Sequence, residues 1–93
     1  MANITHGMNV ESVRDIAKQL DGQAHVVDQV IGAVDKLISQ TQSDWVGKDS
    51  QQFQQLWHGQ YKGQLQKLKQ ELSDLAVKAR SSARSQEDAS NQL

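Results

Sequence analysis

The 93-residue sequence has no cysteine and no proline, and its only aromatic residues are two Trp, one Tyr and one Phe. Without cysteine no disulfide can stabilise a small domain, and a single small core rarely supplies more than about 3–5 kcal/mol. Assembly with another chain is therefore the natural source of further stability. Because proline is missing, no residue forces a break in a helix. The lack of cysteine is compatible with a reducing cytoplasm and equally with secretion.

Long apolar runs and an excess of charge of one sign are also missing. No stretch is apolar and long enough to span a membrane, and the first residues, from Met1 to His6, lack the basic and apolar regions of an ordinary signal peptide. The formal net charge is −1. This balance argues against nucleic acid as a partner and gives little support to membrane contact.

The first half of the chain contains a long heptad pattern. Asn9 suits an N-cap, since its side chain can accept a hydrogen bond from the first helical turn. The pattern predicts a helix over about 9–41, and Ile16, Val30 and Leu37 widen its apolar face enough to contact more than one neighbouring helix. The seam residues, three and four apart, are Val10, Val13, Ala17, Leu20, Ala24, Val27, Ile31, Val34, Ile38 and Thr41.

The second half carries another helical pattern, which begins with aromatic residues. From Phe53 to Leu65 the apolar residues step by four, and beyond Leu65 they alternate between three and four. The run of fours is a stutter-like drift, so the start of this helix should face its neighbours differently from its end. The pattern predicts a helix over about 50–83, followed by a flexible tail at 84–93 that lacks apolar periodicity.

A polar stretch at 42–49 separates the two patterns and predicts a turn. Asp49 and Gln52 have the spacing of a capping box, with Ser50 as the rival N-cap. Gly47 suits a backbone with positive φ. Trp45 would leave about 150–250 Å² of mostly apolar surface in water unless its ring packs on something. Two interpretations stay open for Trp45, a plug at the end of the helix pair or part of a docking surface.

These patterns predict one all-α domain over residues 1–93. The short connection makes the helices an antiparallel two-helix hairpin, and the apolar surface that one hairpin leaves uncovered predicts dimerisation into a four-helix bundle. The residues predicted to form the hairpin or dimer interface are Val13, Leu20, Val27, Ile31, Val34, Ile38, Phe53, Leu56, Trp57, Tyr61, Leu65, Leu68, Leu72 and Leu75.

The chain resembles a known family at this point. Its length, its two long helices, Trp45-Val46-Gly47 in the turn and Phe53 eight residues after Trp45 are similar to the WXG family of early-secreted-antigen-like (Esx) proteins. The resemblance covers the whole chain. It implies a small non-enzymatic substrate of the type VII secretion system, exported as a folded dimer to the outside of the cell without a cleaved signal peptide, and virulence-associated.

The resemblance also implies partners. A similar helical hairpin would complete a homodimer or heterodimer, with a role as partner or chaperone of a co-secreted protein, and the secretion ATPase and machinery would recognise Trp45 and Gly47. The family pairs this turn with a Tyr-x-x-x-Asp/Glu element in the tail of the other protomer. Here no Tyr follows residue 80. Either a partner chain supplies the tail signal, or the chain belongs to a branch with a different tail.

Other functional classes find less support. His6, His25 and His58 are far apart and form no ligand pattern, so no metal site is predicted. No nucleophile stands with a base and no glycine-rich phosphate loop precedes a helix, so neither an enzyme nor a cofactor is predicted. The alternative function is an intracellular coiled-coil adaptor whose Trp-x-Gly turn is coincidental.

Overall fold

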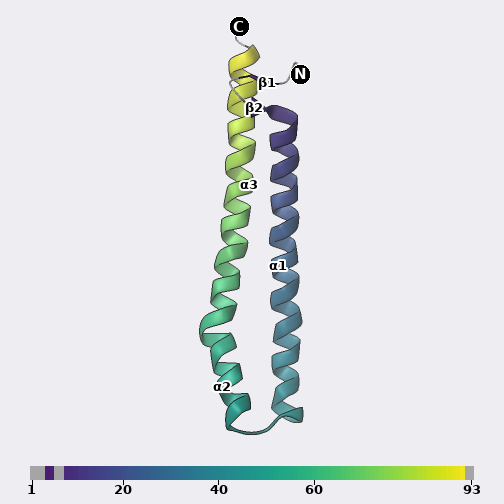
Figure 1. Cartoon of the computed structure of the whole chain (residues 1–93), viewed down its shortest axis with the longest axis vertical. Helices are drawn as coiled ribbons and strands as arrows, with labels where there is room; N and C mark the ends of the chain where they lie inside the picture. Colours follow the sequence, from purple (N-terminus) through teal and green to yellow (C-terminus); the bar gives the residue numbers. More distant parts are fainter. Residues whose placement is uncertain (1–3, 6–7, 92–93) are drawn as a thin grey trace. The chain divides into compact units, whose positions relative to one another are not determined.

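The computed structural model describes residues 4–5 and 8–91 (Figure 1). Two short strands, β1 (Ile4–Thr5) and β2 (Met8–Asn9), pair antiparallel and precede helix α1 (Val10–Asp44). The predicted N-cap is confirmed, because the Asn9 side-chain oxygen accepts a hydrogen bond of 3.1 Å from the Ser12 N–H.

Three non-helical residues, Trp45 to Gly47, follow α1. The chain then continues without interruption through α2 (Lys48–Leu56), a π-helical turn η1 (Trp57–Tyr61) and α3 (Lys62–Asn91). The two long helical stretches form a hairpin, which confirms the all-α class. Two compact units make up the chain, and each contains part of both long helices: the turn unit, residues 24–70, and the terminal unit, residues 1–23 and 71–93.

The turn unit has a small apolar core. Ile31, Ile38 and Trp57 are buried and contact one another, and three half-buried residues complete the packing: Val27, Val34 and Leu65. The residues that α1 contributes lie three and four apart, as the heptad pattern predicts. The buried face of α1 in this unit is therefore the face that the sequence indicates.

The terminal unit is packed mainly through alanine. Ala17, Ala76 and Ala83 have no exposed surface. Two ion pairs connect the helices of this unit: Arg14 to Glu87 at 2.7 Å, and Asp21 to Arg80. Of the predicted interface residues of this unit, Val13, Leu20 and Leu72 are half-buried, and Leu75 is exposed. In this unit the helices therefore pack through small buried side chains, with ion pairs at the edge. In the turn unit they pack through isoleucine and tryptophan.

The end of the second helix corrects the prediction of a flexible tail at 84–93. α3 continues to Asn91, and residues 92–93 lie outside the described part. The inward-facing positions continue at steps of three and four through Ala83 to Gln86, and Glu87 bonds to Arg14. The inward positions here are the buried Ala83 and the half-buried Gln86, so a search for large apolar residues could not detect this part of the seam.

The turn is also shorter than the predicted 42–49. The Trp45 N–H donates to the Thr41 carbonyl at 3.0 Å, which carries the helical bonding to the end of α1. The predicted capping box is not formed. Gly47 is the N-cap of α2 without a side-chain cap bond, and its carbonyl accepts from the Gln51 N–H at 3.1 Å. A helix can start this way because the first-turn amides at an exposed end can bond to water.

Two glycines inside α1 give a stability prediction. A Cβ added at Gly22 or Gly32 would meet no atom within 4 Å. Each change to Ala should therefore raise the free energy of unfolding by about 0.5–1 kcal/mol, through lower backbone entropy of the unfolded chain. Urea unfolding followed by circular dichroism measures this. Gly47→Ala is the opposite control and should destabilise, because Gly47 has φ 145°. Unchanged or lower stability of Gly22→Ala would contradict the prediction.

Candidate functional site

The turn between α1 and α2 exposes two apolar side chains, and its backbone conformation requires a glycine. Gly47 has φ 145° and ψ −179°, a conformation open almost only to glycine, and any other residue there costs about 1–3 kcal/mol. Trp45 is 46% exposed and Val46 85% exposed. The turn therefore needs Gly47 for its backbone and displays the two residues before it.

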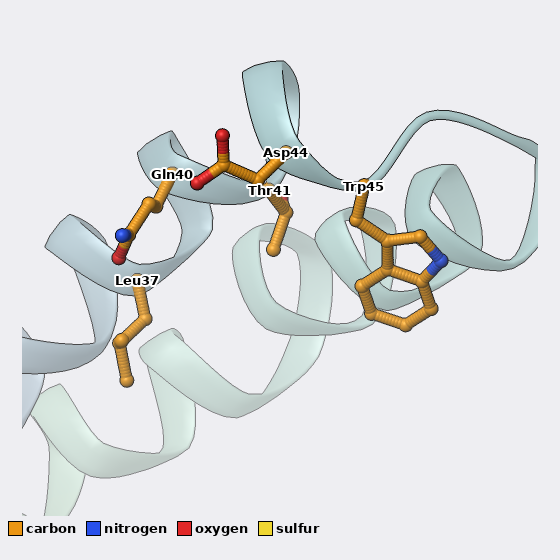
Figure 2. Close-up of a pocket in the computed structure, with 5 residues that line it drawn as sticks. All are labelled: Leu37, Gln40, Thr41, Asp44 and Trp45. Carbon is orange, nitrogen blue, oxygen red and sulfur yellow. The ribbon is translucent and has the colours of Figure 1, made fainter.

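The Trp45 ring packs beside one other aromatic side chain. Its centroid lies 5.9 Å from that of Phe53 on α2, with the rings tilted by 36°, within the range of favourable aromatic pairs. On another side the ring borders a shallow hollow of about 220 Å³ formed with the last turns of α1. Figure 2 shows Leu37, Thr41 and the Trp45 ring pointing to the same side, while the Asp44 carboxylate points away from the ring.

A chain of hydrogen bonds connects α2 to the end of α1 beneath the turn. The Gln54 side-chain N–H donates to the hydroxyl oxygens of Thr41 and Ser50, each at 3.2 Å. The Thr41 hydroxyl donates to the Ile38 carbonyl at 2.6 Å. Ser50 is the buried polar residue of the described part, and this bond satisfies its hydroxyl. These bonds connect the start of α2 to the end of α1.

Asp35 on α1 contacts both ends of the π turn. One carboxylate oxygen accepts from the Trp57 indole N–H at 2.8 Å, and the other lies 2.9 Å from the Lys62 ammonium. The hydrogen bond from Trp57, followed by that from Lys62, holds the pKa of the Asp35 carboxyl below its ordinary value. Trp57 is 5% exposed, so Asp35 satisfies the one polar group of a buried ring.

Further ion pairs lie along the same flank of α1. In the turn unit the Asp28 carboxylate lies 2.9 Å from the Lys69 ammonium, and this hydrogen bond lowers the pKa of Asp28. In the terminal unit the Arg14 guanidinium binds both Glu87 oxygens, which lowers the pKa of Glu87 and raises that of Arg14. Cross-helix ion pairs therefore border the seam within each unit.

These carboxylates predict an acid-sensitive fold. Asp28, Asp35 and Glu87 have lower pKa values when folded, so their contribution to stability is complete above their unfolded pKa values, about 4, and disappears as the pH falls through the folded values. Thermal unfolding by circular dichroism at fixed protein concentration should show the melting temperature falling below about pH 4. Asp35→Asn should flatten this fall, and Asp88→Asn, at an exposed position of α3, serves as control. Equal profiles for both variants would contradict the assignment.

The predicted interface residues divide into two groups. Those that lie at the seam within the units are Val13, Leu20, Val27, Ile31, Val34, Ile38, Trp57, Leu65 and Leu72. The others are more than a third exposed within this chain: Phe53, Leu56, Tyr61, Leu68 and Leu75. The structure brings Trp45 beside Phe53, while Tyr61 and Leu68 lie away from the seam.

Sequence reasoning missed the polar residues that support the turn. Asp35 follows Asp28 by seven residues, and both come directly after a seam position, so heptad spacing was a usable signal for a cross-helix pair. Gln54 offered no such signal, since it is one of several glutamines in α2.

Within residues 4–5 and 8–91, no group of three or more His, Cys, Asp or Glu residues could hold a metal ion. Neither long helix in that part is apolar enough to cross a membrane.

The fold and the turn define a class, the helical-hairpin proteins with a Trp-x-Gly connection. The chain belongs to the family described as proteins of 100 residues with WXG, which matches residues 7–90. This confirms the resemblance seen in the sequence. Members of this WXG family are small, non-enzymatic helical proteins secreted as type VII substrates, and they typically pair as helical hairpins. No curated protein and no solved structure matches the chain.

Proposed function

We propose that this chain is a non-enzymatic substrate of a type VII secretion system, exported to the extracellular space without a cleaved signal peptide as a folded pair of helical hairpins. The observation that carries the proposal is the family match over residues 7–90, together with Trp45-Val46-Gly47 forming the non-helical connection between the long helices. The displayed Trp45 ring and the glycine-dependent backbone at Gly47 are the features that the secretion machinery recognises.

An apolar surface of the turn unit supports pairing with a second hairpin. This surface, the open stripe, consists of Val26, Val30 and Leu37 on α1, Tyr61 of η1 and Leu68 on α3, and each is 43–56% exposed. Val30 and Leu37 come directly before the buried seam residues Ile31 and Ile38. An uncovered apolar face of this kind needs a partner, because a two-helix unit has no further element to cover it.

The two sides of the seam differ in character. Val30 and Leu37 precede seam positions of α1, whereas Asp28 and Asp35 follow them, so the two pairs lie on opposite flanks of the helix. In an antiparallel helix pair, the residues directly before the seam positions of the two helices lie on the same face of the pair. Leu68 of α3 therefore lies on the same face as Leu37 of α1. Ion pairs therefore border one side of the turn unit and apolar side chains the other.

The terminal unit has its own exposed apolar residues in equivalent positions. Ile16 precedes the buried Ala17 and is 52% exposed, and Leu75 precedes the buried Ala76 and is 51% exposed. In each unit, therefore, apolar side chains are exposed on the side of the seam opposite the ion pairs. The partner that fits is a hairpin of the same family, either a second copy or a related chain, which could also be a co-secreted protein that this chain accompanies.

The test is export from a host that carries a matching type VII system. Trp45→Ala and Gly47→Ala should accumulate in cells and disappear from the culture supernatant, because each removes one of the recognised features. Val46→Ala is the matched control, since Val46 is more exposed than Trp45 but is not part of the Trp-x-Gly pattern. Absence of the wild-type chain from the supernatant, with its partner and the system present, would overturn the proposal and favour an intracellular adaptor.

A further inference from the structure

The π turn η1 is clamped by a residue from the opposite helix. Its defining bond runs from the Lys62 backbone N–H to the Trp57 carbonyl, five residues apart. Asp35 accepts from the Trp57 side chain at 2.8 Å and pairs with the Lys62 side chain at 2.9 Å. The two residues that close the π turn through their backbones are therefore the two that Asp35 holds through their side chains.

A π turn contains one residue more than an α-helical turn and is less stable in isolation, so it persists where its surroundings favour it. Replacing it by regular α-helical bonding would rotate α2 relative to α3 by one residue, about 100°. Phe53 lies on α2, and its ring is 5.9 Å from the Trp45 ring. A rotation of that size would separate Phe53 from Trp45. The orientation of the aromatic pair thus depends on the π turn.

We propose that Asp35 is a positioning residue for the Trp45 turn: by bridging Trp57 and Lys62 it holds the π turn, and the π turn sets the rotation of α2 that brings Phe53 against Trp45. This inference rests on the proposed function, in which the secretion machinery recognises the Trp45 turn. Asp35 itself lies on α1, one heptad after Asp28 and ten residues before Trp45. Its effect on the turn is therefore indirect.

The structure offers a matched control for this role. Asp28 and Asp35 are both acids of α1 in the turn unit, and each pairs with a lysine of α3 at 2.9 Å. Asp28 pairs with Lys69, well inside α3, and so has no connection to the ends of the π turn. Asp28→Leu removes an equivalent ion pair, so it separates loss of the clamp from loss of a cross-helix ion pair in general.

The first experiment is NMR on the purified full chain. In the wild type, a coupling across the hydrogen bond from the Lys62 amide to the Trp57 carbonyl reports the π turn, and an NOE between the Trp45 and Phe53 rings reports the aromatic contact. Both signals should persist in Asp28→Leu. In Asp35→Leu both should be lost, with the Lys62 amide now coupled to the His58 carbonyl. Asp35→Asn, which keeps an acceptor for the Trp57 N–H, should retain the Trp45–Phe53 NOE.

Trp57→Phe is the second variant, in case Asp35→Leu fails to fold. It keeps a buried ring, removes the N–H that Asp35 accepts from, and should lose the same two signals. Persistence of both signals in folded Asp35→Leu or Trp57→Phe would overturn the proposal and assign the fixing of α2 to the Gln54 bonds. Equal loss of both signals in Asp28→Leu would also overturn it, since the effect would then belong to cross-helix ion pairs in general.

Export is measured separately, so that the two proposals fail in distinguishable ways. Asp35→Leu should be lost from the culture supernatant while Asp28→Leu is exported like the wild type. If the wild type is not exported, the proposed function fails, and the NMR result still decides whether Asp35 holds the π turn. If the NMR signals change as expected but Asp35→Leu is exported normally, the clamp is real and its role in recognition is overturned.

Discussion

Trp57→Ala is expected to unfold the turn unit. Trp57 is 5% exposed and is the largest side chain of the core that it forms with Ile31 and Ile38. Truncating a buried Trp costs about 3–5 kcal/mol through lost burial and the remaining cavity. A small core supplies about the same amount in total. The change also leaves Asp35 without its indole donor. Urea unfolding by circular dichroism should therefore show no folded baseline for Trp57→Ala without a partner chain.

Trp45→Ala is the matched control for that experiment, since it removes the same side chain from a 46% exposed position. It should cost about 1 kcal/mol or less, mainly through loss of the contact with Phe53. The two tryptophans thus divide their roles between the stability of the core and the surface of the turn. Similar stability losses for Trp45→Ala and Trp57→Ala would contradict this division.

The double change Leu37→Glu and Leu68→Glu is expected to abolish pairing with a second hairpin. Both residues lie on the open stripe and are 56% and 44% exposed, so the isolated hairpin should tolerate the charges. Burying them against a partner would cost at least about 2 kcal/mol each, or roughly 30-fold in the dissociation constant per residue. Light scattering after size exclusion should show only the monomeric mass, for the chain alone or mixed with its partner.

Val77→Glu tests whether any added charge has this effect. Val77 is 64% exposed on α3 and lies outside the flank that precedes the seam. Its variant should pair like the wild type. If the stripe variant pairs as tightly as Val77→Glu, the partner does not bind at the open stripe. A wild-type chain that stays a stable monomer with every related hairpin would contradict pairing itself.

The sequence made the seam of α1 predictable because its inward positions carry almost only apolar residues, at an unbroken spacing of three and four. The second helix was less predictable. Leu68 and Leu75 look like core residues by hydrophobicity, yet they lie exposed, whereas Ala76, the residue after Leu75, is buried. The run of fours lies across the π turn η1, but hydrophobic spacing alone could not show that the helix contains such a turn.

At the candidate site the sequence indicated the displayed residues but not their support. Trp45 and Gly47 were identifiable because an aromatic residue and a glycine stand in a short polar break between helices. Asp35 and Gln54 act through hydrogen bonds to residues distant in the sequence, and a polar residue on a helix gives no sign of which partner it meets. Predicting those contacts required knowing which residues of the two helices lie opposite each other.

The ion pairs along the helices also constrain how the chain can fold. Asp21, Asp28 and Asp35 recur every seven residues on α1, and their partners Lys62, Lys69 and Arg80 all belong to α3. If α1 paired with α1 of another copy during synthesis, rows of carboxylates would face each other, and like charges at such positions destabilise. The same acids that satisfy Trp57 and the lysines would thus penalise pairing of α1 with α1 of another copy. Charge reversal at these three acids would place positive charges opposite Lys62, Lys69 and Arg80 and is expected to destabilise the pairing of α1 with α3.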